Sequence, residues 1–285
     1  LPLELVSRIA FFAWQNRQLL APCSVVCRKW QAAFEPLLYS NLDVCSDDIY
    51  LNKHTLFKYT MPLSLSQFRT LMSGVGLKKR RWLRTLRYTI ALPHRIEDWK
   101  ALKSDLYVGI HIERLKNDQK FGEALADLFK TLATWNEQHR LSLEITVLGY
   151  KTCVEYDTEW APDAYDYTWN MRLGHEFALP PYRARFLDDD VSKLVDVPCI
   201  DRITFPNKDD LHGTTKLRHQ TWVGAMFEII EHCPTLTEAH LDLDEYVRPD
   251  HDDLIRERRQ ALAEGLLKLP RTLKKLHCAN AIERN

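Results

Sequence analysis

The sequence predicts an α/β fold in which a small helical unit precedes an irregular solenoid of parallel strands and outer helices. Three observations predict this class. Apolar residues recur at helical spacing in residues 1–44, short runs of alternating apolar and polar residues begin near residue 82, and amphipathic stretches separate those runs. We therefore expect a helical unit at 1–44, a linker at 45–81 and a solenoid domain at 82–285.

The composition argues against several classes of protein. Hydrophobic residues make up 45% and charged residues 27% of the 285 residues, which is typical of a globular protein with a sizeable core. The 39 basic and 39 acidic residues balance, so we do not expect a nucleic-acid partner. No apolar run approaches the roughly 20 residues of a transmembrane helix, so we expect no membrane partner either.

The seven cysteines are scattered and form no C-x-x-C pair. A disulfide framework needs a dense, even set of cysteines in a short secreted chain. We therefore expect reduced thiols that pack as small apolar side chains, and a cytoplasmic or nuclear location. Because the chain begins at Leu1, we also expect upstream sequence in which a targeting segment could lie.

The helical unit opens with Pro2 in a first helical turn, where its missing N–H group costs little. Leu5 and Ile9 follow at helical spacing, and a second apolar stripe occupies residues 27–34. Pro36 is expected to end that second helix. A unit of about 40 residues buries only a small core, so it usually needs a partner surface.

The linker at 45–81 has no clear period, apart from a short helical piece around residues 66–72. It ends in the basic run Lys78-Lys79-Arg80-Arg81. Such a run is expected to lie on a solvated face, and a contact with an acidic partner is the alternative.

Strands and helices alternate in the solenoid domain. A period of two indicates half-buried strands, and an apolar stripe at spacings of three and four indicates helices that pack on them. The expected strands are 83–90, 141–147, 203–205, 239–243 and 276–278, and the expected helices are 121–135, 222–233 and 254–269.

The alternation also predicts which strand residues face away from the core. Leu86, Ile145 and Leu241 are expected to point inward, as is Cys278 in the last strand. The outward set includes Arg87, Glu144, Arg202, His240, Asp242 and His277. We expect these side chains to line one face of mixed charge that binds a partner protein.

The last two strands are preceded by similar sequences. Each begins with a proline just after a predicted helix and leads into the pattern Leu-x-x-(Leu/Ala)-x-(Leu/Cys). The two sequences are Pro234-Thr235-Leu236 and Pro270-Arg271-Thr272-Leu273. This pattern resembles the leucine-rich repeat, in which a parallel strand is followed by an outer helix. The strands lie roughly 36 to 60 residues apart, further than the ~20–29 of regular repeats, so the predicted solenoid is irregular.

Residues 1–44 resemble an F-box. The resemblance rests on Leu1-Pro2-x-Glu4-Leu5-x-x-x-Ile9, Leu19-Leu20, Val26-Cys27-Arg28-x-Trp30, Leu38 and Leu42. It covers essentially the whole motif, and Phe11-Phe12-Ala13-Trp14 departs from it by being more aromatic than is usual in the family. The rest of the chain resembles, at the level of pattern, the leucine-rich-repeat-like C-terminal regions of fungal F-box proteins.

F-box proteins are substrate receptors of Skp–cullin–F-box ubiquitin ligases. The resemblance implies that residues 1–44 dock on a Skp-family adaptor, and through it on a cullin, while the downstream domain binds a protein substrate. It implies no catalytic residue, cofactor or metal in this chain. The adaptor-binding residues, carried over by position, are Leu1, Pro2, Leu5, Ile9, Val26, Cys27 and Trp30. The alternative for each is a place in the internal core of the helical unit.

An acidic, aromatic segment lies at residues 155–170 and contains no basic residue. Tyr156, Trp160 and Trp169 are candidate contacts for a basic or peptide partner, since aromatic side chains are enriched in binding surfaces. The alternative is that the rings fold back over the solenoid.

His240-x-Asp242-x-Asp244 places three polar side chains on one face of a strand, where a metal or hydrolytic site could form. Polar residues alternate in the same way on any exposed strand, and no second histidine lies at ligand spacing in the sequence. The leading hypothesis is therefore a non-enzymatic F-box substrate receptor. The alternatives are an adaptor-binding scaffold outside any ligase, and a hydrolase or metalloenzyme that uses the His240 strand.

Overall fold

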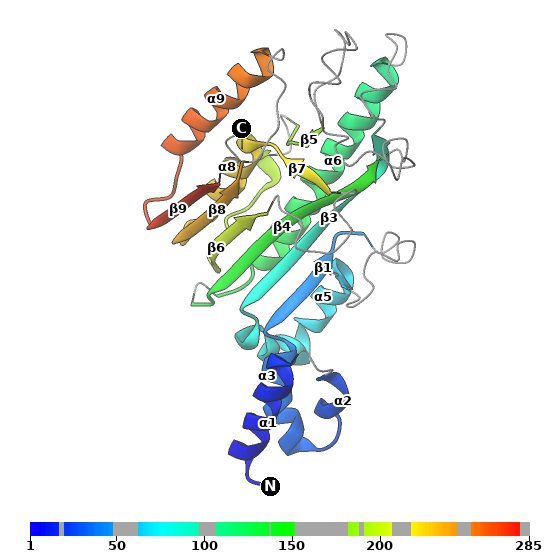
Figure 1. Ribbon diagram of the computed structural model, residues 1–285, viewed down its shortest axis with the longest axis vertical. Coiled ribbons are helices and arrows are strands. Elements are labelled where there is room, and N and C mark those ends of the chain that lie inside the picture. The colour runs from blue at the N-terminus through cyan, green and yellow to red at the C-terminus, as the bar shows by residue number, and fades with distance from the viewer. Residues whose placement is uncertain are drawn as a thin grey trace, which may run out of the picture.

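The computed structural model describes residues 1–16, 20–47, 62–96, 107–136, 138–151, 182–187, 191–206, 218–243 and 252–279. The chain folds as an α/β protein with a mostly parallel sheet, as the sequence predicts. Figure 1 shows a small group of helices that carries the N-terminus at one end of the molecule and the sheet that follows it.

The described part of residues 1–40 holds three helices, α1 (Leu3–Gln15), α2 (Ala21–Ser24) and α3 (Arg28–Leu38). They enclose a small core that is separate from the core of the sheet, and its buried members are Val6, Ala10, Leu20, Ala33 and Phe34. Pro36 lies inside α3 and does not end it. The Tyr39 N–H still donates to the Glu35 carbonyl at 3.0 Å, so the proline removes only one hydrogen bond near the helix end.

The sheet follows the order of the chain over most of its width. Its main path is β2 (Leu63–Ser64), β1 (Asn41–Cys45), β3 (Thr85–Ile96), β4 (Leu141–Lys151), β6 (Ile200–Phe205), β8 (Glu238–Asp242) and β9 (Lys275–Ala279). Every neighbouring pair on this path is parallel. Off the path, β7 (Arg218–Thr221) pairs antiparallel with β4 and parallel with β5 (Arg183–Ala184).

The three helices that the sequence predicts after residue 82 correspond to α6 (Tyr107–Leu132), α8 (Val223–Glu231) and α9 (Asp252–Leu267). Phe121 and Leu125 of α6 and Ile229 of α8 are fully buried against the inward side chains of the strands. Figure 1 shows α6 behind β3 and β4. The α9 helix packs on α8, where Gly265 leaves room for the ring of Phe227. The helices thus bury one face of the sheet.

Much of the predicted linker at 45–81 packs against the sheet. Residues 62–81 hold β2, the helix α5 (Leu65–Leu71) and most of the 3₁₀ segment η1 (Gly74–Trp82). Ser64 and Gln67 cap α5 in a capping box, and Phe68 is fully buried in the core of the sheet. The sequence predicts the short helix at 66–72, which corresponds to α5, but a two-residue strand and a seven-residue helix are too short to show that they pack into the core.

The two similar turns before β8 and β9 make the same hydrogen bond. The Thr235 hydroxyl donates to the carbonyl of Pro198 at 2.6 Å, and the Thr272 hydroxyl donates to the carbonyl of Pro234 at 2.9 Å. Each threonine therefore connects its own turn to the turn of the preceding unit.

Cys278 is exposed, although the alternation predicted that it points into the core. Leu276 on the same strand is only half-buried. Both side chains are less covered than predicted because β9 is the edge strand of the main path and has a partner strand on one side only.

Candidate functional site

Exposed apolar side chains are concentrated on the helical unit. This set, which we call the docking surface, consists of Leu1, Leu3, Leu5, Ile9, Phe11, Phe12, Trp14, Val25 and Val26. Most of them belong to α1, which carries apolar residues on nearly every side. A helix of that kind is normally buried on all sides, and exposed apolar patches are typical of interaction surfaces.

The geometry of α1 separates its core-facing side from its exposed side. Val6 and Ala10 are one turn apart and fully buried against α3. Leu5 and Ile9 precede them by one residue each and are therefore rotated by about 100° around the helix axis. Leu5 is 44% exposed and Ile9 is 43% exposed. These two apolar side chains lie outside the internal core of the unit.

Six of the seven predicted adaptor-binding residues are exposed, namely Leu1, Pro2, Leu5, Ile9, Val26 and Cys27. Trp30 differs, because it is half-buried and its ring stacks on Phe34 with centroids 5.2 Å apart. The alternative of an internal role therefore applies in part to Trp30 and not to the other six.

A second candidate surface is the sheet face opposite the helices, which we call the open face. Parallel pairing in register connects one row of residues across six strands. The row consists of Asp43, Arg87, Glu144, Thr204, His240 and His277. Partner residues on parallel strands point to the same face of a sheet. Burial alternates along these strands as the sequence predicts, so Arg87, Glu144, Arg202, His240 and Asp242 all lie on the open face.

Ion pairs cross the open face from strand to strand. The Arg87 guanidinium binds both carboxylate oxygens of Asp43, with Nη2 3.2 Å from Oδ2. Arg202 Nη2 lies 2.9 Å from Glu238 Oε2. Asp43 and Glu238 did not stand out in the sequence, because the register between strands decides which charges meet.

We expect substitutions on the open face to leave stability nearly unchanged. Arg202→Glu and His240→Ala should each change the free energy of unfolding by less than about 1 kcal/mol, because exposed ion pairs contribute little. The Arg202 side chain is 51% exposed and that of His240 is 37% exposed. Chemical denaturation of each variant checks this, and a loss above about 2 kcal/mol would show that the open face is part of the core packing.

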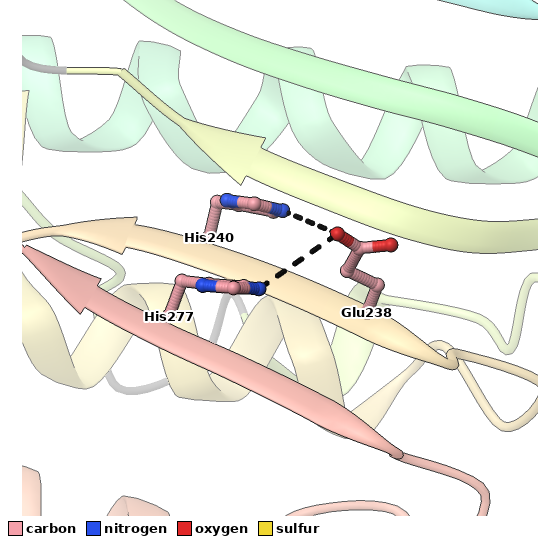
Figure 2. Close-up of side chains that lie close together, drawn as sticks. All are labelled: Glu238, His240 and His277. Carbon is pink, nitrogen blue, oxygen red and sulfur yellow. Dashed lines mark hydrogen bonds and ion pairs between the residues drawn. The ribbon is translucent and has the colours of Figure 1, made fainter.

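Three side chains converge where the open face reaches β8 and β9. His240 and His277 are Cα partners, and their rings stack with centroids 4.3 Å apart and planes 10° apart. Glu238 Oε1 lies 2.8 Å from His240 Nε2 and 3.8 Å from His277 Nε2. Figure 2 draws both contacts as dashed lines. We call these three residues the His–Glu cluster. The hydrogen bond from His240 and the nearby cations hold the pKa of Glu238 below its usual value.

The pattern His240-x-Asp242-x-Asp244 predicts three polar side chains on one strand face, and the structure describes the first two of them. Asp242 lies on the open face, and Asp244 lies outside the described residues. The structure instead brings Glu238 and His277 to His240. The Glu-x-His spacing in one strand is a sequence signal for the contact between Glu238 and His240. The contact with His277 depends on pairing with a strand more than thirty residues away, which no local pattern predicts.

The acidic, aromatic segment cannot be placed beside either surface, since Tyr156, Trp160 and Trp169 lie outside the described residues. Their role as partner contacts stays a prediction.

Residues of the basic run pack on aromatic rings. Lys79 Nζ lies 4.5 Å from the centroid of the Tyr39 ring, and the guanidinium carbon of Arg80 lies 5.0 Å from that of Trp135. Such cation–π contacts stabilise a fold modestly. They also connect η1 to the end of α3 and to the core of the sheet.

Two thiols in the core are poorly suited to nucleophilic chemistry. Burial raises the pKa of Cys199 to about 12 and that of Cys233 still further. The thiolate is the reactive form of cysteine, so neither residue is a nucleophile near neutral pH.

Among the described helices, none is long and apolar enough to span a membrane.

Comparison with protein-family models, with curated proteins and with solved structures gave no match to this chain. A functional assignment therefore depends on the docking surface and the open face themselves.

Proposed function

We propose that this protein is a non-catalytic substrate receptor of a Skp–cullin–F-box ubiquitin ligase. Residues 1–44 act as an F-box that docks on a Skp-family adaptor and through it on a cullin. The sheet domain binds a protein substrate on its open face. The chain contributes proximity and orientation, and other subunits make the covalent bond.

The docking surface is the observation that carries this proposal. Six of the seven residues that the F-box resemblance assigns to the adaptor are exposed on a unit with a very small core of its own. Leu5 and Ile9 in particular have no structural role inside the unit that would explain their apolar character. An adaptor groove that covers α1 would bury them and complete the packing of the unit.

The order of the sheet supports a leucine-rich-repeat-like solenoid for the substrate-binding part. Parallel strands in chain order with helices on one face are the arrangement that such repeats produce. The matched bonds of Thr235 and Thr272 support repetition of one unit at the end of the sheet.

The junction between the two parts supports a receptor that holds its substrate in a fixed direction. Arg84 and Thr85 both donate backbone hydrogen bonds to the Ser40 carbonyl, at 2.8 and 3.0 Å. Tyr39 stacks on Trp82 with ring centroids 6.3 Å apart, and Lys79 lies over the same tyrosine. The docking surface is thereby tied to the first strands of the sheet without a free linker.

The open face suits a partner of mixed charge. It carries arginine, carboxylate and histidine side chains in neighbouring rows, at intermediate to high exposure. Charged groups of this kind steer and orient a partner more than they stabilise the fold.

Co-purification tests the proposal. The tagged chain expressed in cells should recover a Skp-family adaptor and a cullin in stoichiometric amounts, and depletion of the adaptor should raise the level of the other proteins that bind the chain. An adaptor complex without any effect on the abundance of those proteins would favour the scaffold alternative. Failure to recover an adaptor would contradict the F-box assignment itself.

A further inference from the structure

We propose that the His–Glu cluster of Glu238, His240 and His277 is a binding site for a divalent transition-metal ion, with Zn²⁺ as the best match. The proposal concerns the sheet domain alone, and it stands whether or not the helical unit binds an adaptor.

Backbone geometry brings the two histidines together. Residues 240 and 277 face each other in register on the parallel strands β8 and β9, so their side chains leave the sheet in the same direction. The rings are nearly parallel, and both direct Nε2 toward the carboxylate of Glu238 (Figure 2). Two imidazole nitrogens and one carboxylate oxygen therefore converge on one point.

The distances are close to those of a metal site. One ligand atom from each of the three residues lies within 4.8 Å of the other two. Ligands around a tetrahedral zinc ion lie about 2.0–2.2 Å from the metal, which places them a little more than 3 Å apart. The histidine side chains are partly exposed, so small rotations of their rings can close this difference.

The donor set selects the type of metal. Two imidazoles with one carboxylate suit Zn²⁺ and its first-row neighbours, whereas Mg²⁺ and Ca²⁺ prefer oxygen ligands throughout. Three protein ligands leave a coordination position of zinc for water or for a side chain of a bound protein.

Arg202 holds the third ligand in place. Its Nη2 binds Glu238 Oε2 at 2.9 Å, and this leaves Oε1 directed at the two histidines. Outer partners of this kind orient metal ligands in many sites. The same positive charge opposes the metal, so we expect moderate affinity and not the affinity of a structural zinc site.

A zinc titration of the untagged 285-residue chain tests the site. Isothermal titration should show one equivalent of Zn²⁺ that the His240→Gln/His277→Gln variant does not bind, and Glu238→Gln should weaken the same site by about 10- to 100-fold. An excess of Mg²⁺ should not displace the zinc. His232→Gln is the matched control, because His232 also pairs with a carboxylate, that of Asp196 at 3.0 Å, but lies outside the cluster.

A second readout uses the unmodified chain. Zn²⁺ should protect His240 and His277, but not the half-buried His139 outside the cluster, from carbethoxylation by diethylpyrocarbonate as measured by mass spectrometry of the peptides. Equal zinc binding by the chain and the double variant, or equal labelling of His240 and His277 with and without zinc, would overturn the proposal.

Discussion

Replacement of both Leu5 and Ile9 by aspartate is expected to abolish binding of the Skp-family adaptor. The two side chains are partly exposed in the free chain and would be buried in the complex, where an unpaired carboxylate is costly. A lost anchor in a desolvated interface costs about 2 kcal/mol or more, so two such changes weaken binding by roughly 1,000-fold or more. Isothermal titration of the variant with purified adaptor measures the effect.

The matched control is Leu267→Asp. Leu267 is 87% exposed at the end of α9, far from the helical unit along the chain, so the same chemical change should leave adaptor affinity intact. The F-box assignment is wrong if the double variant binds the adaptor as tightly as the control does. Trp30 is a less clean probe, because truncation would also remove its stack on Phe34.

Phe68→Ala is expected to destabilise the sheet domain by about 3–5 kcal/mol, the usual cost of deleting a large buried ring. Phe68 is fully buried, and its ring lies 6.0 Å from that of Trp135, which follows α6. A residue in a solvated linker would have no such effect. Thermal or chemical denaturation of the sheet domain measures the difference.

Val75→Ala is the control within the same segment. Val75 is 99% exposed, and its truncation should change stability by no more than about 0.5 kcal/mol. Similar small effects for both variants would mean that α5 does not belong to the core of the sheet domain.

The sequence allowed prediction of the elements that bury the most apolar surface. Leu86, Tyr88 and Ile90 alternate over a strand long enough to show its period, and α8 buries an apolar stripe with Ile229 and Ile230 at its centre. These patterns predicted the parallel strands, the helices between them and the face on which Arg87 and His240 lie.

The sequence did not allow prediction of features that depend on pairing between distant segments. The strand β1 was assigned to the end of the helical unit because only five residues carry its alternation. Asp43 meets Arg87, and His277 meets His240, only through the register of neighbouring strands. No local period contains that information, and the same limit hid the His–Glu cluster.

Hydrogen exchange of the chain with and without a Skp-family adaptor tests the F-box proposal without any substitution. The helical unit has a small core, so its amides should exchange quickly in the free chain and become protected in the complex. We expect strong new protection in α1 and α3 and unchanged exchange in β6, β8 and β9. Absence of a complex, or protection confined to the sheet with none in α1, would contradict it.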